Sequence, residues 1–79
     1  MNDNIALKII ELHEAIDSLV TESMDGLEPW NLEEINQMVE GAEKTCEFFK
    51  EQDNVDRIIY ELTTLHNWLI LYIRGVIEF

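Results

Sequence analysis

Three runs of apolar residues recur at helical spacing along this 79-residue chain, and two short breaks separate them. Apolar residues three or four positions apart lie on one face of an α-helix, so each run predicts an amphipathic helix. The first break contains Pro29, which has no amide hydrogen to donate, and the second contains Gln52, Asp53 and Asn54. Helices of about 20 residues joined by such short connections favour antiparallel neighbours. The sequence therefore predicts an all-α fold, a small antiparallel three-helix bundle.

We expect the helices at about residues 4–25, 32–52 and 55–78, within one domain that covers residues 1–79. Asp3 or Asn4 can cap the first helix, and Gly26 stands where a left-handed residue would end it. Asp53 or Asn54 can cap the third helix.

The second helix carries a possible capping box at its start. Asn31 can accept hydrogen bonds from the free amides of the first turn, and Glu34 can reach back to the cap. With Asn31 as the cap, Trp30 and Ile35 occupy the two positions of a hydrophobic staple. We therefore expect Trp30 to fix the direction in which the chain enters this helix.

The third apolar run is unusual because residues 68–73 are apolar all the way round the helix. Such a segment is either central to a core or covered by something outside its own fold. The run is shorter than the roughly 20 residues that cross a bilayer, so we expect no transmembrane segment. We expect a homodimer or a partner-bound form rather than a free monomer, with these residues in self-association or docking: Trp68, Leu71, Tyr72 and Phe79.

The charge of the chain is strongly negative, with 5 Lys and Arg against 17 Asp and Glu and a formal net charge of −12. Such a surface repels phosphate, so we expect no direct binding to nucleic acid or to an anionic membrane. The first residues carry no basic segment, and Lys8 and Glu11 interrupt the apolar positions. We therefore expect no signal peptide and a cytoplasmic protein.

Side chains that could perform catalysis or bind metal are few. Cys46 is the only cysteine, and neither His13 nor His66 has the Glu-x-x-His spacing of di-iron helical bundles. Glu11 and Glu22 lie 11 residues apart, which at 1.5 Å per residue is roughly 16 Å along a helix, so they cannot share an ion. We expect no metal, no cofactor and no enzymatic activity.

Acidic residues instead form a stripe along the first helix: Glu11, Glu14, Asp17, Glu22 and Asp25. Like charges at this spacing lower the stability of the helix by roughly a few tenths of a kcal/mol per pair. Solubility alone does not require acidic residues at this density. In composition the chain resembles the small acidic helical proteins of phages and mobile elements that inhibit restriction or CRISPR complexes. That resemblance implies a nucleic-acid mimic that binds a basic, nucleic-acid-binding protein and inhibits or modulates it through this stripe.

Three other interpretations remain open. The acidic residues can serve solubility alone. The apolar face of the third helix can dock the chain onto another helical protein as an adaptor, chaperone or antitoxin-like subunit. A helical oligomer that binds a small ligand or nucleotide would have a few aromatic and cationic residues for its pocket: Tyr60, His66, Trp68 and Arg74.

Overall fold

The computed structural model describes residues 3–77 and contains three α-helices and a short 3₁₀ turn in this range. The elements are α1 (Asp3–Ser23), the 3₁₀ turn η1 (Met24–Gly26), α2 (Pro29–Glu51) and α3 (Val55–Ile77). The all-α three-helix fold that the apolar spacing predicts is thus confirmed.

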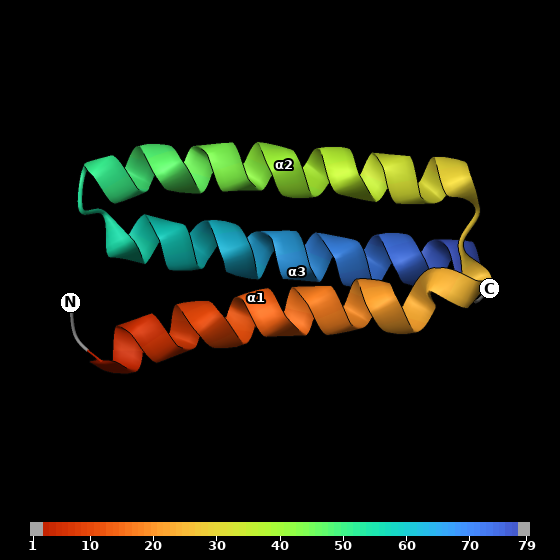
Figure 1. Ribbon diagram of the computed structural model, residues 1–79, viewed down its shortest axis with the longest axis horizontal. Coiled ribbons are helices and arrows are strands. Elements are labelled where there is room, and N and C mark those ends of the chain that lie inside the picture. Colours follow the sequence, from red (N-terminus) through yellow and green to blue (C-terminus); the bar gives the residue numbers. More distant parts are fainter. Residues whose placement is uncertain (1–2, 78–79) are drawn as a thin grey trace.

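The third helix lies between the other two (Figure 1). The chain runs along α1, returns along α2 and runs back along α3, so α3 is antiparallel to α2 and parallel to α1. α3 packs against both neighbours along its length, whereas α1 and α2 scarcely approach one another. The molecule is elongated and rather flat, with extents of 40 × 21 × 16 Å.

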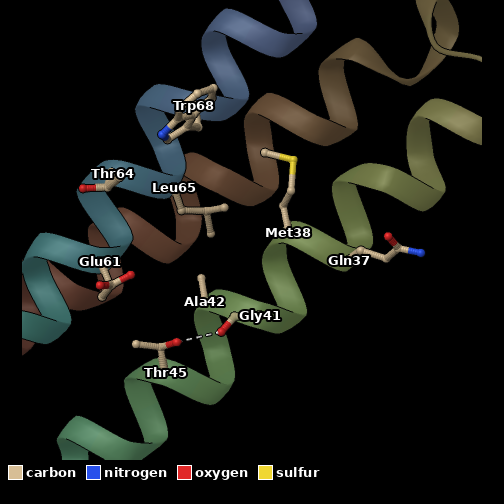
Figure 2. A pocket seen from close by; sticks show the side chains of 9 residues that line it. All are labelled: Gln37, Met38, Gly41, Ala42, Thr45, Glu61, Thr64, Leu65 and Trp68. Atoms are coloured by element: carbon tan, nitrogen blue, oxygen red, sulfur yellow. Dashed lines mark hydrogen bonds between the residues drawn. The ribbon is translucent and has the colours of Figure 1, made fainter.

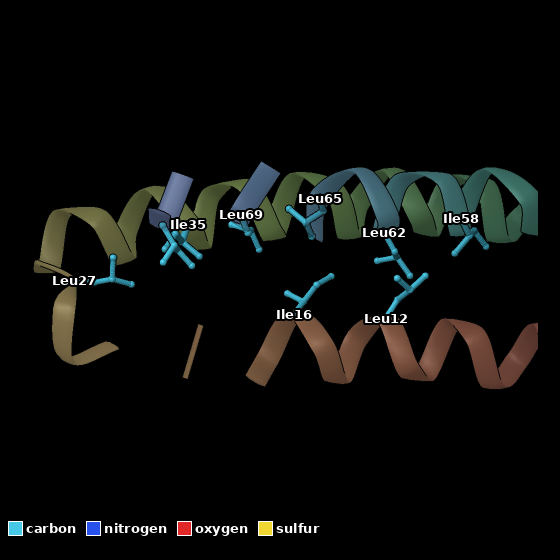
Figure 3. Close-up of a cluster of buried hydrophobic side chains, with 9 residues drawn as sticks. Leu12, Ile16, Leu27, Ile35, Ile58, Leu62, Leu65 and Leu69 are labelled. Carbon is cyan, nitrogen blue, oxygen red and sulfur yellow. The ribbon is translucent and has the colours of Figure 1, made fainter. Parts of the chain in front are cut away.

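The core follows from the apolar stripe of α3, whose buried residues recur every three or four positions and meet side chains of α1 and α2 (Figure 3). Buried hydrophobic residues come from all three helices and the α1–α2 connection: Leu12, Ile16, Leu27, Ile35, Ile58, Leu62, Leu65, Leu69 and Ile73. More than half of them belong to α3. Burying each such side chain contributes about 1.5–3 kcal/mol.

The start of α2 differs from the sequence expectation. The helix begins at Pro29, with Glu28 as the N-cap, three residues before the expected start. Proline suits the first helical position because its missing N–H would have no partner there and its φ is already helical. Asn31 is therefore not the cap. Its side-chain oxygen Oδ1 accepts a hydrogen bond of 2.9 Å from the backbone N–H of Glu28, so it reaches back as the third residue of the helix.

The hydrophobic staple moves with the cap. Trp30 is 61% exposed, so the expected role in fixing the entry into α2 is wrong. With Glu28 as the cap, the staple positions are Leu27, which is buried, and Leu32, which packs against the same core cluster.

The ends of the other helices are set by different means. No glycine in residues 3–77 has a positive φ, so Gly26 does not end α1 in a left-handed conformation. A Cβ on Gly26 would lie 2.9 Å from Cδ1 of Ile77, so the glycine instead leaves room for the end of α3. At the other turn Asp53 adopts a left-handed φ of 55°. Asn54 caps α3 as expected, since its Oδ1 accepts the backbone N–H of Arg57 at 3.3 Å.

A small polar cluster joins the first turn of α2 to the far end of α3. Asn31 is fully buried, and its Nδ2 donates a hydrogen bond of 3.1 Å to the hydroxyl of Tyr72. That hydroxyl in turn donates to the carboxylate of Glu34. Since buried polar groups are costly unless paired, this cluster favours one alignment of α2 along α3.

Replacing Asn31 with Ala tests the cluster. The substitution removes the acceptor for Glu28 N–H and the donor to Tyr72, so the free energy of unfolding should fall by about 1–3 kcal/mol in urea denaturation. The control is Asn36→Ala, because Asn36 is exposed on the same helix. Equal stability of the two variants would contradict the role given to Asn31.

Candidate functional site

The acidic stripe of α1 lies on the surface. All five predicted residues are exposed: Glu11, Glu14, Asp17, Glu22 and Asp25. The first four belong to α1, and Asp25 lies in the turn η1 that continues it. They point away from α3 because the apolar positions of α1, such as Leu12 and Ile16, occupy the opposite face. The stripe is elongated, and Glu11 and Glu22 are still separated by roughly 16 Å along the helix axis.

The described part of the chain offers no obvious metal centre. Within it, no group of three or more His, Cys, Asp or Glu side chains is placed to hold a metal ion. No helix in the same range is long and apolar enough to cross a membrane.

The four residues expected to mediate self-association have different environments. Trp68 and Leu71 are 61% and 66% exposed on α3. Tyr72 is half-buried against the core, and its hydroxyl is bonded to Asn31 and Glu34 of its own chain. Phe79 lies outside the described residues. The structure thus leaves Trp68 and Leu71 open on the surface and turns Tyr72 partly inward.

The apolar run 68–73 has a double role. Leu69 and Ile73 belong to the buried core, whereas Trp68 and Leu71 face outward. The fold of one chain therefore buries only part of this apolar segment. The outward half is the part that a second molecule could cover.

Trp68 stands at one end of a shallow groove of about 370 Å³ between α2 and α3 (Figure 2). Met38, Ala42 and Leu65 contribute apolar surface, and Gly41 and Thr45 continue the α2 side. No atom lies within 4 Å of the place where a Cβ of Gly41 would be, so this glycine faces open space. The groove is therefore open and only weakly polar.

Charge is scarce on this side of the molecule. The sequence has no Asp or Glu between Glu61 and Glu78, and Arg74 is the only Lys or Arg in that interval. Glu61 is half-buried at the groove. The surface around Trp68 is thus the neutral part of a chain with a net charge of −12.

A cluster of aromatic rings and one cation lies at the turn between α2 and α3. The guanidinium carbon of Arg57 lies 5.4 Å from the ring centre of Phe49 and 5.1 Å from that of Tyr60. Phe48 meets Phe49 edge to face, with ring centres 5.5 Å apart. This spacing is typical of cation–π contacts, which contribute about 0.5–1 kcal/mol at exposed sites. The sequence analysis missed the cluster, although Arg57 and Tyr60 lie three positions apart on α3. The contact of Arg57 with Phe49 joins α3 to α2 and depends on how these helices align.

The groove between α2 and α3 was also not foreseen from the sequence. The available signal was the absence of Asp and Glu from positions 62–77. In a chain with a net charge of −12, such a stretch indicates a surface with little charge. The α2 side of the groove, with Gln37, Gly41 and Thr45, has no comparable signal. Its position depends on how the helices align.

Comparisons with known protein families, with curated proteins and with solved structures found no match to this chain.

The Tyr72 hydroxyl provides a test by pH. Its hydrogen bond to Glu34 raises the pKa of Tyr72 above the ordinary value of 10.0, and the hydrogen bond from Asn31 opposes this shift in part. Just above pH 10 the folded state keeps the hydroxyl proton that the unfolded state releases. The contribution of this hydrogen bond to the free energy of unfolding is therefore complete below pH 10 and is lost as pH rises through the folded pKa. In urea denaturation the stability of the wild type should fall in this range, and Tyr72→Phe should show a shallower fall.

Two features keep this test specific. Burial, together with the carboxylates of Glu61 and Glu43, also raises the pKa of the Cys46 thiol above 9.0. The thiol is present in the wild type and in Tyr72→Phe, so its effect cancels when their alkaline slopes are compared. Tyr60→Phe is the control because it leaves the bond between Tyr72 and Glu34 in place. An unchanged alkaline slope in Tyr72→Phe would show that this bond does not contribute.

Proposed function

We propose that this protein is a non-enzymatic interaction protein whose acidic surface binds a basic, nucleic-acid-binding protein and inhibits or modulates it. The observation that carries the proposal is the exposure of the whole α1 stripe, from Glu11 to Asp25, on the side of the helix that the bundle does not use. Rows of exposed carboxylates attract a basic surface from a distance and occupy positions that phosphates would otherwise take. In this role the protein acts as a nucleic-acid mimic in the cytoplasm.

The distribution of charge supports this function. Most exposed carboxylates lie on α1 and α2, and α3 has Asp56 in its first turn but none at positions 62–77. The mutual repulsion of the carboxylates is unfavourable for the isolated chain, and a basic partner would relieve it. A purely solubilising surface gains nothing from this separation of charged and neutral sides.

A second surface function is favoured by Trp68 and Leu71. Both side chains are more than 60% exposed, and Trp68 borders the open groove between α2 and α3. We propose that this neutral side mediates homodimer formation. The alternative for the same side is docking onto another helical protein, as an adaptor, chaperone or antitoxin-like subunit would do.

Reversal of charge on α1 tests the acidic surface. Glu14→Lys combined with Glu22→Lys should weaken capture of basic proteins by the immobilised protein at least about tenfold, because two attractive contacts become repulsive. Bound proteins should be nucleic-acid-binding proteins, should elute between about 50 and 500 mM NaCl, and should be displaced by added DNA or RNA. Circular dichroism should show an unchanged helical fold.

The matched control is Glu33→Lys combined with Glu51→Lys, which changes the net charge equally at exposed positions of α2. This control should retain binding if the α1 stripe is the contact surface. Equal loss in both variants would show that only net charge matters. Unchanged binding by the α1 variant would contradict the proposed function.

A further inference from the structure

A second groove lies on the side of the bundle where α1 and α2 fail to meet. It measures about 390 Å³ and is lined by residues of all three helices. Helices that pack on a common neighbour but scarcely touch one another are arranged like diagonal helices of a four-helix bundle. The groove therefore has the position of a fourth helix, diagonal to α3.

The inner surface of this groove is apolar. Ile9 of α1, Cys46 of α2 and Ile58 of α3 come together in it, and Ile58 is buried. Ile10 also lines the groove but is 53% exposed, which leaves an apolar side chain at the α1 edge. A ligand that fits must bring apolar side chains to contact these residues.

The groove has carboxylates at its α2 edge. Glu43 and Glu47 line its α2 side, with Lys50 as the only Lys or Arg among the lining residues. Residues one helical turn apart are neighbours on a helix surface. The exposed Glu14 therefore neighbours Ile10 on the α1 side, and the exposed Glu40 neighbours Glu43 on the α2 side.

The environment of Cys46 is consistent with this negative edge. Burial is the main cause that raises the pKa of its thiol, and the carboxylates of Glu61 and Glu43 raise it further. The groove thus combines an apolar interior with the carboxylates of Glu43 and Glu47 at its α2 edge.

We propose that the groove between α1 and α2 binds an amphipathic helix of the basic partner, which completes a four-helix bundle. This inference rests on the proposed function and gives it a structural form. The apolar face of the incoming helix contacts Ile9, Ile10 and Ile58, and its Lys or Arg side chains pair with carboxylates such as Glu43 and Glu47. A second copy of this chain is a poor occupant, because its net charge of −12 would meet edges of the same sign.

The probe is a synthetic amphipathic peptide of about 15 residues with leucines at i, i+3, i+4 and i+7 and lysines on both sides of that face. A peptide of the same composition with the leucines scattered round the helix serves as its control. In methyl NMR spectra, the patterned peptide should shift the signals of Ile9, Ile10 and Ile58. Met38 and Leu65, which line the other groove, should remain unaffected.

The matched variants are Ile10→Asp and Leu7→Asp. Both residues lie on α1 with nearly equal exposure, 53% and 54%, but only Ile10 lines the groove. Ile10→Asp should weaken binding of the patterned peptide at least about tenfold, because it places a charge in an apolar contact. Leu7→Asp should bind within about twofold of the wild type, and both should keep the wild-type circular dichroism spectrum.

Several results would overturn the inference. Equal binding of the patterned and scattered peptides, with no effect of Ile10→Asp, would show attraction by charge alone; the groove would fail while the proposed function stands. Shifts at Met38 and Leu65 would place the helix in the other groove. No peptide binding at all would refute the groove, and the capture experiment on α1 would still decide the proposed function. A dimer that Ile10→Asp alone dissociates would make a second copy the occupant.

Discussion

Burial of one stripe on α3 is the interaction on which the other features of this small bundle depend. The stripe packs against the apolar faces of both neighbouring helices, so α1 and α2 are each held through α3. It consists of Ile58, Leu62, Leu65, Leu69 and Ile73. Contact between α1 and α2 is then unnecessary for the fold. The outer surfaces of these two helices stay exposed and can carry charge.

This arrangement explains how a chain with a net charge of −12 can fold. Most of the carboxylates lie on exposed positions of α1 and α2, where water and salt screen their repulsion. The helix that is packed on two sides has none between positions 62 and 77. Its outward residues Trp68 and Leu71 are uncharged, so the molecule has acidic sides and one neutral side with different possible partners.

Much of the fold could be predicted from the sequence because helical spacing of apolar residues is a strong and local signal. The three helices and the cap at Asn54 are confirmed. The expected start of α2 is misplaced because Asn31 is a preferred N-cap residue and Glu28 is not. The preference of proline for the first helical position was the available sequence signal for a start at Pro29. The exposed stripe of α1 could be foreseen, whereas its function remains a proposal.

Other features depend on tertiary alignment and left no clear pattern in the sequence. The all-round apolar run at residues 68–73 allowed a central third helix as one of two explanations, and helical spacing alone did not decide between them. The partly inward position of Tyr72 depends on Asn31 and Glu34, about 40 residues earlier in the chain. The two grooves arise from the offset between helices, so their lining could not be assigned from periodicity.

We propose that the charged and neutral surfaces act separately, with self-association on the neutral side and the acidic sides left free. Light scattering during size exclusion, at low and high salt, distinguishes this arrangement from the alternatives. The protein should then have twice the mass of one 9.3 kDa chain at both salt concentrations, because a neutral interface is little affected by screening. A monomer at both concentrations, or a dimer only at high salt where the acidic sides could meet, would contradict it.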